Sequence, residues 1–449
     1  MPTNFSAWDT MPISVTQRAF SETYNLEEKE RKEAAELNKN YYYGKQENDV
    51  ILMNDDVNPI TMNITKPIMT KRCSMLYARP LVREFDGPSQ SIKFIEQVYK
   101  DNKIDSLLGK VDLYAELTGS VLIHPTNDED LPGKIRLVIY DASEFSSAGN
   151  DDDPNTADAI ALTRILSRLV DNSPVTSDGR KQPQIEKTIL QQIWTSDSVV
   201  IYEGNNMVVS QPNDLGFLPF VNFQGEEVHN AYVGYPIATV VRKLNSHINQ
   251  LLTHLGYTIK MQSGTPIVFS GFKSGETVVV HPGRAVNIPE GATANVLNLD
   301  PKINESLEFI KYLEDRLYTT SSVPRISVEG GDGKSGRELM VRWFPLLKVF
   351  QEKSNRYGIY EMQLANMILA IAGMPPINDL KIHWPEESIL PLSAEDDNLE
   401  RDIKFNIKSP IDEIMRRDPH LSEIDAEAEY LTNLAQNKEI NNQQGASIK

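Results

Sequence analysis

Residues 337–373 read RELMVRWFPLLKVFQEKSNRYGIYEMQLANMILAIAG. Apolar residues recur in this stretch at steps of mostly three or four, which is the period of an α-helix. A continuous helix of this length would span roughly 55 Å at ~1.5 Å per residue, whereas an average globular helix has roughly 11–12 residues. Pro345 lies about one-quarter of the way along and would remove one i→i−4 hydrogen bond. The stretch therefore predicts a long helix with a kink at Pro345.

A glycine-rich segment precedes this helix and contains Gly330, Gly331, Gly333, Lys334 and Ser335. A Gly-Lys-Ser triplet at the start of a helix suggests a phosphate-binding loop, but that pattern also needs a glycine where Val328 stands. The residues before it are too few, and too close to Pro324, for a buried parallel strand, which weighs against a nucleotide site. Two interpretations stay open: a flexible loop before a helix, and a loop whose backbone amides, Lys334 and Arg337 face a polyanion.

The composition indicates a folded protein of several parts. A chain of 449 residues is too long for one simple core and predicts roughly two to four domains or subdomains. No run of about 18 apolar residues occurs, so we expect no transmembrane helix, and the N-terminal residues lack a signal-peptide pattern. Cys73 is the only cysteine, which excludes a disulfide within one chain and fits a reducing compartment.

The net charge limits the possible contacts with nucleic acid. At −18, the chain does not suit a protein that grips nucleic acid over a large surface, because such binding depends on clustered Lys and Arg. The charge does not exclude a protein past which nucleic acid slides, since a surface that repels phosphate overall favours passage over capture.

The chain before residue 236 divides into a helical part and a β-rich part. Helices are predicted at 25–40, 63–78, 91–100 and 103–118. Strands are predicted at 120–124, 134–140, 188–195, 198–202 and 207–210, with 215–223 closing an antiparallel meander. The apolar run from Ala159 fits either a strand or a short helix. Past Gly373 prolines mark an irregular connection, and the C-terminal part is expected to hold short helices at 393–406, 409–418 and 422–436.

Two amphipathic helices enclose a short β-like region at 265–299. The first, at 236–262, places its apolar residues on one face at nearly ideal steps, and the second begins after Asp300 as N-cap. This order predicts an antiparallel helical stalk with a β cap at its tip. Off the apolar face of the first helix stand Arg242, Asn249 and Lys260. Such positions usually form a solvated face, and they matter for function only if copies of the helix surround a channel.

No sequence pattern points to catalysis or to a cofactor. The seven histidines are scattered, and the motifs GxSxG, HExxH and CxxC are absent. The acidic runs Asp55-Asp56 and Asp151-Asp152-Asp153 fit solvated loops better than cation sites. We therefore expect no enzyme activity, no metal and no cofactor.

The order of these parts resembles the portal proteins of tailed bacteriophages over most of residues 25–435. The matching features are Tyr43-Gly44 after the first helix, GFLPFVNF at 216–223, Pro282-Gly283 and Pro289-Glu290-Gly291 in the small β unit, and Ser322-Val323-Pro324 before the loop with Ser335-Gly336. The second of these is similar to the family's Gly-x-x-Pro-x-x-x-Phe strand. The order and spacing of the features together carry the resemblance.

The resemblance implies an α+β portal fold with eight parts. These are an N-terminal arm (1–24), a wing (25–234), a first stem helix (235–264), a clip (265–299), a second stem helix (300–319), a tunnel loop (320–336), a long wing helix (337–373) and a short crown with a C-terminal tail (374–449). The channel residues implied are Arg325, Gly330, Gly331, Gly333, Lys334, Ser335 and Arg337 at the tunnel loop, with Arg242, Asn249 and Lys260 on the stem.

The resemblance also implies a function and partners. Portals are rings of about twelve copies around a closed axis at one capsid vertex of the virion, assembled in the host cytoplasm. Double-stranded DNA enters through the ring, driven by the terminase large subunit, and later leaves through it. A head–tail adaptor, the major capsid protein and a scaffold protein are the other expected partners. The rival functions are a P-loop-like nucleotide-binding enzyme and another virion structural protein of the tail or baseplate.

Overall fold

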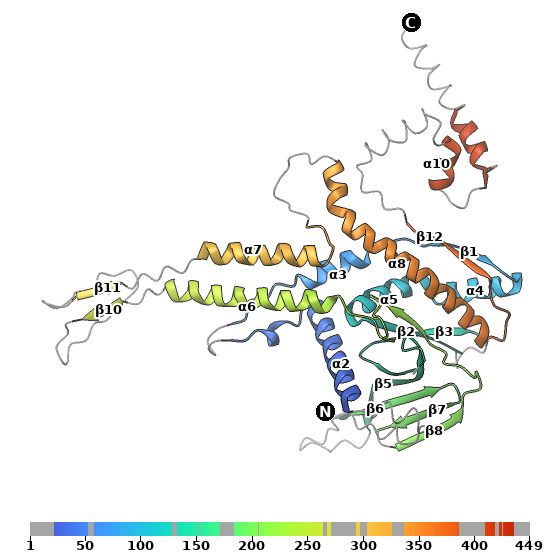
Figure 1. Cartoon of the computed structure of the whole chain (residues 1–449), viewed down its shortest axis with the longest axis horizontal. Coiled ribbons are helices and arrows are strands. Elements are labelled where there is room, and N and C mark those ends of the chain that lie inside the picture. The colour runs from blue at the N-terminus through green and yellow to red at the C-terminus, as the bar shows by residue number, and fades with distance from the viewer. Residues whose placement is uncertain are drawn as a thin grey trace, which may run out of the picture.

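The computed structural model describes residues 22–52, 58–127, 133–150, 152–170, 184–204, 206–263, 267–270, 293–296, 303–325, 336–385, 409–417, 422–423 and 425–434. Helices and antiparallel sheets both occur, so the expected mixed α and β composition is confirmed. Figure 1 shows two long helices that project side by side from a body of helices and sheets. None of the described helices combines the length and the apolar character that a membrane span requires.

The first core of the body lies between helices and a three-stranded sheet. The sheet has the order β3-β2-β9, formed by β2 (Ser120–Asn127), β3 (Ile135–Asp141) and β9 (Val221–Gln224), and both pairings are antiparallel. Helices α4 (Ser89–Asp101), α5 (Ile104–Thr118) and α8 (Gly336–Ile371) pack around it. The fully buried apolar residues of this core include Leu108, Val111, Phe223, Tyr357, Leu364 and Ile368.

A second core joins the projecting helices to the body. It lies among α2 (Glu22–Tyr42), α3 (Thr65–Cys73), α6 (Ala238–Ser263) and α7 (Ile303–Thr320), with η2 (Glu47–Asp49) nearby. Its buried apolar residues include Ile68, Met69, Val241, Ile248, Leu317 and Leu346. Because Leu346 belongs to α8, the long helix contributes to both cores.

A five-stranded antiparallel sheet forms the far side of the body. Its strands follow the chain order: β4 (Phe145–Gly149), β5 (Ala157–Val170), β6 (Gln184–Thr195), β7 (Ser198–Glu203) and β8 (Asn206–Pro212). The run from Ala159, which fitted either a strand or a helix, is part of β5. The expectation that 215–223 closes this meander is wrong, because β9 pairs with β2 in the other sheet. That pairing buries Val221 and Phe223 in the first core.

The two projecting helices are α6 and α7, and the short antiparallel pair β10 (Ile267–Ser270) and β11 (Thr293–Val296) lies at their far end (Figure 1). Their apolar faces meet each other, with Ile248 and Leu255 of α6 in the same cluster as Ile310 and Leu317 of α7. Most of the region expected to form a β cap, 265–299, lies outside the described residues.

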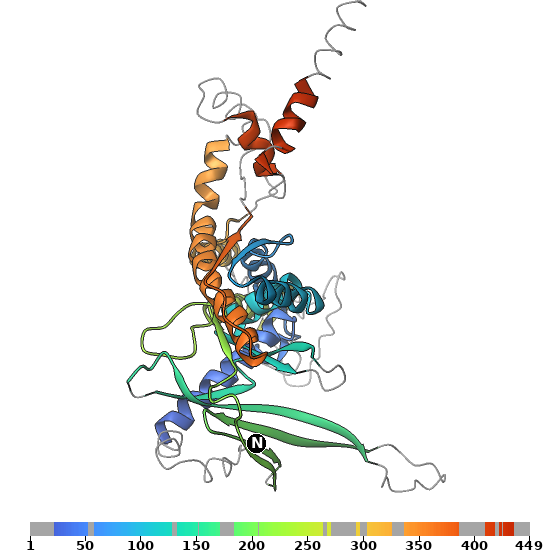
Figure 2. The same ribbon diagram turned by 90° about the vertical axis from the view of Figure 1, so that its right-hand side faces the viewer.

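The long helix α8 continues through Pro345 as one element. Figures 1 and 2 show its axis turning near the N-terminal end. After α8 the chain returns to the body, because β12 (Asp379–His383) pairs with β1 (Val82–Asp86) and Ile377 is buried in the first core. The sequence interpretation missed this strand. Farther on, α10 (Pro410–Arg417) corresponds to the helix expected at 409–418, whereas 393–406 lies outside the described range.

Gly119 occupies the junction between α5, β2 and the chain entering α6. Its φ of +98° lies in the left-handed region, and its N–H caps α5 by donating to the carbonyl oxygen of Ala115 at 2.8 Å. A Cβ at this position would overlap the carbonyl oxygen of Gly234. Both constraints require glycine here.

We expect Gly119→Ala to lower the free energy of unfolding by more than about 2 kcal/mol, since it adds a backbone clash to the ordinary cost of a left-handed alanine. Urea denaturation followed by tryptophan fluorescence measures the change. Gly216→Ala is the matched control, because φ is +69° there and no atom lies within 4 Å of the added Cβ; about 1 kcal/mol is expected. Equal losses in the two variants would contradict the proposed clash.

Candidate functional site

One face of α6 carries a ladder of polar side chains inside the subunit. Asn245, Asn249 and Thr253 follow one another at steps of four residues, and all three are buried. Asn245 Oδ1 accepts from the N–H of Ile64 at 3.0 Å, Asn249 Oδ1 from that of Met62 at 2.8 Å, and Thr253 Oγ1 from that of Ile60 at 2.9 Å. Four helical residues rise ~6 Å and two extended residues ~6.6 Å, so the two repeats nearly match. The ladder thus fixes the extended segment 60–64 along α6.

Two of the three residues predicted to face a channel from the first amphipathic helix, Asn249 and Arg242, make hydrogen bonds inside the subunit. Asn249 also donates from Nδ2 to Gln46 Oε1 at 2.8 Å and has no exposed surface, so its side chain is fully occupied within the subunit. Arg242 turns toward α2, where its Nε donates to Asn38 Oδ1 at 2.9 Å. Of the three stem residues predicted from the sequence, only Lys260 is exposed.

The residues predicted for the loop before α8 are placed only at its two ends. Arg325 forms ion pairs with Asp315 and with Glu314, the latter at 2.8 Å, and these hold it on the last turns of α7. Gly330, Gly331, Gly333, Lys334 and Ser335 lie outside the described residues. Arg337 belongs to the first turn of α8, and its side chain is likewise outside what is described.

A chain of buried charges lies beneath α8. Lys353 forms ion pairs with Asp112 and, at 3.0 Å, with Glu116. Glu116 also pairs with Arg72 at 2.7 Å, and Arg72 donates from Nη1 to the carbonyl oxygen of Ser321 at 2.8 Å. Lys353, Asp112 and Glu116 are each at most 1% exposed. The charges therefore connect α8, α5 and α3 with the end of α7, where the loop begins.

The charge state of this chain follows from burial and from the neighbouring charges. Burial raises the pKa of Asp112 above its ordinary value in spite of Lys353. Burial acts on Glu116 in the same direction, but Lys353 and Arg72 together outweigh it and lower its pKa. Burial alone would lower the pKa of Lys353, but Asp112 and Glu116 raise it. The ammonium group is therefore held in its charged form.

A second buried charge pair fixes the middle of α8 to β1. Arg83 Nε pairs with Glu361 at 2.6 Å, and Arg83 Nη1 pairs with Asp105 at 2.8 Å. Tyr77 donates to the other oxygen of Glu361 at 3.0 Å. Glu361 is fully buried, whereas Asp105 is partly exposed, so these ion pairs run from the core toward the surface.

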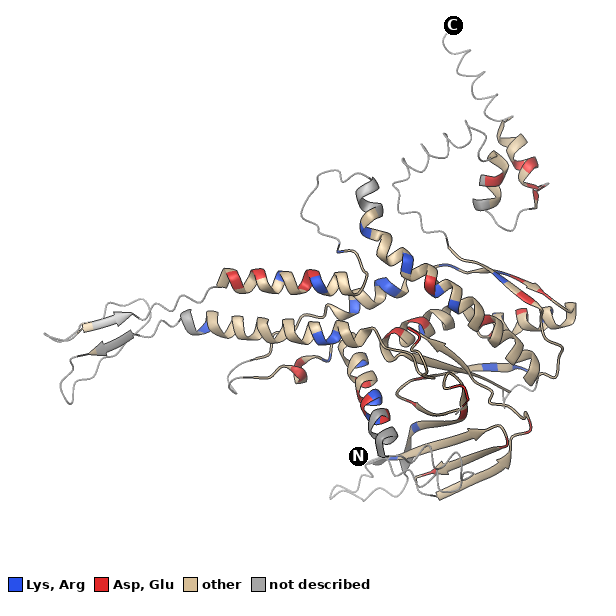
Figure 3. Cartoon of the chain, viewed as in Figure 1, with Lys and Arg blue, Asp and Glu red and all other residues tan. Residues whose placement is uncertain are grey.

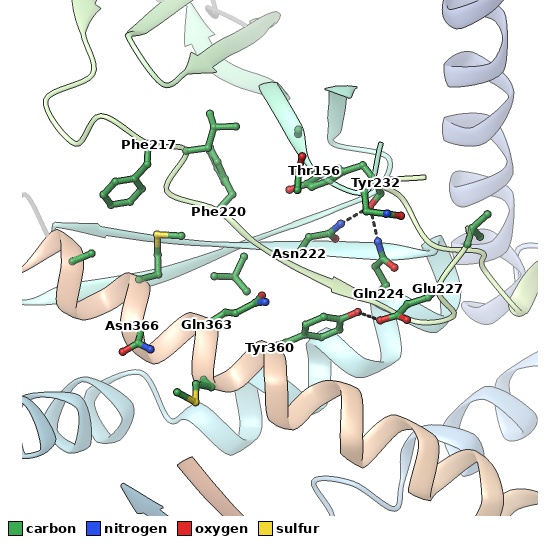
Figure 4. A pocket seen from close by; sticks show the side chains of 18 of the residues that line it. Thr156, Phe217, Phe220, Asn222, Gln224, Glu227, Tyr232, Tyr360, Gln363 and Asn366 are labelled. Atoms are coloured by element: carbon green, nitrogen blue, oxygen red, sulfur yellow. Dashed lines mark hydrogen bonds between the residues drawn. The ribbon is translucent and has the colours of Figure 1, made fainter. Parts of the chain in front are cut away.

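A cleft of about 1270 Å³ opens beside the C-terminal half of α8 (Figure 4). Its floor is α8 and β9, and its borders are the β4–β5 turn and the loop after β9. In Figure 4, Tyr360 donates to Glu227 at 2.7 Å, and Asn222 and Gln224 both donate to the carbonyl oxygen of Tyr232. The lining is mainly aromatic, methionine and neutral amide side chains. The lining thus offers apolar contacts and amide hydrogen-bonding groups to whatever occupies the cleft.

The two projecting helices differ in charge (Figure 3). The sequence of α6 contains Arg242, Lys243 and Lys260 and no carboxylate, whereas α7 contains Glu305, Glu308, Glu314 and Asp315 against Lys311 and Arg316. No described group of three His, Cys, Asp or Glu residues is arranged to hold a metal ion.

Comparison with known proteins identifies the family. The model of the family described as phage portal protein, SPP1 Gp6-like, matches residues 22–413, which include the body, the two projecting helices and α8. The chain belongs to this phage portal protein family. The resemblance inferred from the sequence is thereby confirmed.

Two solved structures contain chains similar to this portal chain. One is titled "Neck of empty GTA particle computed with C6 symmetry"; the match has 12% identity and a TM-score of 0.46 and covers 76% of this chain and 86% of that one. The other is titled "Virion of native gene transfer agent (GTA) particle", with 11% identity, a TM-score of 0.43 and coverage of 76% and 84%. No curated protein matches the chain.

Family membership assigns the chain to the structural components of a phage-type virion, in a portal or connector role. The sequence analysis predicted the two amphipathic helices α6 and α7 of this portal chain but missed its buried charges. A signal was present, because Asp112 and Glu116 lie four residues apart among Leu108, Val111 and Ala115, which are fully buried. Paired charges within an apolar stripe indicate a buried counter-charge.

We expect Lys353→Met to lower the free energy of unfolding by about 3–5 kcal/mol at pH 7, because it leaves two buried carboxylates without their ammonium partner. The pKa of Asp112, which burial already raises, should then rise further above that of the unfolded chain, whereas Glu116 keeps its ion pair with Arg72. The native variant would bind more protons than its unfolded state, so its stability should increase as the pH falls from 7 toward 5. Denaturation at several pH values measures this.

Lys348→Met is the matched control on the same helix. Its side chain is 69% exposed and pairs with Glu352 at 3.9 Å, so little change is expected at any pH. A loss of stability in Lys353→Met that did not shrink at low pH would contradict the assigned role of Asp112.

Proposed function

We propose that this chain is the subunit of a portal ring at one capsid vertex, through which the terminase packages double-stranded DNA and from which the DNA later leaves. The observation that carries the proposal is the family match across the body, the paired stem helices and α8. The paired helices with a small β pair at their end give the elongated shape that a channel wall requires (Figure 1). We further propose that the head–tail adaptor binds this ring and that capsid and scaffold proteins surround it.

The parts of the chain take the following roles in this proposal. The body, within 25–234 together with α8, is the wing, and residues 374–385 are assigned to it as well because β12 pairs with β1. Helices α6 and α7 are the stem, the region 265–299 is the clip, and 320–336 is the tunnel loop. The remaining C-terminal residues form the crown and tail.

The cations proposed to approach DNA are Lys334, Arg337 and Lys260. Arg325 is assigned a different role, because its ion pairs with Asp315 and Glu314 fix the start of the loop on α7. Asn249 and Arg242 are left out, since both are engaged inside the subunit. A few cations on a chain of net charge −18 would guide DNA without retaining it, because tight phosphate contacts would oppose translocation.

The purified full-length chain is expected to form rings with a central hole. Copies of an elongated subunit that contact each other through two different faces close into a ring when the rotation between them completes a circle. Negative-stain electron microscopy with class averaging tests this. Monomers or open fibres at micromolar concentration would contradict the portal assignment.

Replacing Lys334 and Arg337 together by Ala should change the amount of DNA packaged per head at least about twofold while rings still form, because two phosphate-facing charges are lost. Protection of DNA from nuclease in a packaging reaction is the readout, with microscopy of the rings in parallel. Lys348→Ala with Lys381→Ala removes the same charge at positions that are each 69% exposed, and should have no effect. If both variants packaged as much DNA as the unchanged protein, Lys334 and Arg337 would be excluded from the DNA path.

A further inference from the structure

The distal part of the β5–β6 hairpin has no strand beside it. The two strands pair from Ala159 with Thr195 to Val170 with Gln184. Strand β4 accompanies β5 only as far as Leu162, and β7 accompanies β6 only as far as Leu190. Among the described strands, none flanks residues 165–170 and 184–189, which we call the distal ribbon. Figure 2 shows this ribbon extending well beyond the body of the subunit.

One face of the distal ribbon presents an apolar pair to water, and the polar pair Ser167 and Lys187 follows it. Ile165 lies directly opposite Ile189, and their side chains are 68% and 39% exposed. Lys187, two residues before Ile189, stands on the same face and is exposed. An isolated two-stranded ribbon is only marginally stable in water. These features indicate a ribbon whose apolar face is covered in the assembled protein.

The cleft beside α8 has the complementary properties. Its lining includes Phe217, Val228, Met362 and Met367. Its volume of about 1270 Å³ exceeds the ~300–1,000 Å³ of a typical small-molecule pocket. Several lining residues are exposed, among them Val228 at 39%. The cleft can therefore receive a segment of protein from outside the subunit.

The charges of the two surfaces are opposite. The two segments bordering the cleft, the turn 150–157 and the loop 225–235, include the exposed residues Asp152, Asp153, Glu226 and Glu227. Neither segment contains Lys or Arg. The distal ribbon carries Arg168 and Lys187 against Glu186 in its sequence, so it is net basic. The complementary charges would favour one orientation of ribbon and cleft.

The two surfaces also lie on opposite sides of the subunit. In Figure 2 the distal ribbon extends to the right, whereas the turn 150–157 and the loop 225–235 lie at the left. A closed ring of more than two copies requires a heterologous contact, in which one side of each subunit meets a different side of the next. A projection on one side and a recess on the other meet that requirement.

We propose that the distal ribbon of each subunit inserts into the α8 cleft of the next copy, with Ile165 and Ile189 against the methionine and aromatic lining and Lys187 near the acidic border. The partner is a second copy of this chain. The inference rests on the ring of the proposed function and identifies the contact that would link neighbouring wings.

Cross-linking of cysteine variants tests this contact in the full-length chain. Ile165→Cys places a thiol on the ribbon, and Gln363→Cys places one on an exposed position of the cleft (Figure 4). A chain with both changes, treated with a short bismaleimide, should give a ladder of covalent multimers on a denaturing gel. A mixture of the two single variants should give covalent dimers and nothing larger, because each chain then carries only one engineered thiol and can be linked to only one neighbour. The native chain, with Cys73 alone, measures the background.

The outcomes separate the contact from the proposed function. Rings in the microscope together with a ladder support both. Rings without a ladder, or a cross-link within one chain that leaves monomers, would overturn the ribbon contact and leave the portal assignment intact. Absence of rings would count against the proposed function and against this contact with it. The control chain carries Ile165→Cys with Met207→Cys, because Met207 is 56% exposed on β8, away from the cleft. This chain should give no ladder.

A second variant tests the same contact without cross-linking. The double variant Ile165→Asp with Ile189→Asp replaces the two apolar side chains of the contact by carboxylates. It should raise the concentration at which half of the chains form rings by about tenfold or more. The thermal unfolding of the isolated subunit should change little, because both side chains are exposed there. Unchanged assembly would contradict the proposal.

Discussion

Two buried carboxylates on α5 constrain much of the structure around the long helix. Asp112 and Glu116 lie in the interior, where an unpaired charge costs several kcal/mol. The compensating ammonium group comes from α8, and the compensating guanidinium group comes from α3. Three elements far apart in the sequence must therefore meet at one place. Because Arg72 also holds the carbonyl oxygen of Ser321, the same group of charges fixes where α7 ends.

This arrangement explains how one helix can serve two cores. The N-terminal half of α8 contributes Leu346 to the core at the base of the projecting helices, and the C-terminal half contributes Tyr357, Leu364 and Ile368 to the core beside the sheet. Lys353 lies between the two halves. The body and the two projecting helices are thus joined through a helix that is anchored by charge in the middle and by apolar packing on both sides.

The sequence predicted the regular parts of the fold and not the connections between them. The apolar periodicity of α6, α7 and α8 is a local property, so these helices could be placed before the structure was known. The pairing of β9 with β2 could not, because it depends on a partner about 100 residues away. The strand β12 was missed for the same reason, since its five residues alternate only weakly and gain their order from β1.

In the candidate site, too, the residues that depend on distant partners could not be assigned from the sequence. A polar residue off the apolar face of a helix is normally solvated, and the resemblance to portal proteins implied that Asn249 faces a channel. The structure instead covers it with an extended segment that has no periodic signal of its own. Arg325 likewise looked free in the sequence, because Asp315 and Glu314 precede it by about three helical turns. Side-chain partners of this kind become visible only when the backbone is placed.

The ladder of Asn245, Asn249 and Thr253 also has a mechanical consequence. Its hydrogen bonds are spaced along the helix axis and all point across it, toward one extended segment. A force along the axis of α6 would load these bonds in shear, so that they would share the load and would have to break together. A force that lifted the segment from its end would break them one at a time. The contact between α6 and this segment therefore resists axial pull far better than sideways peeling.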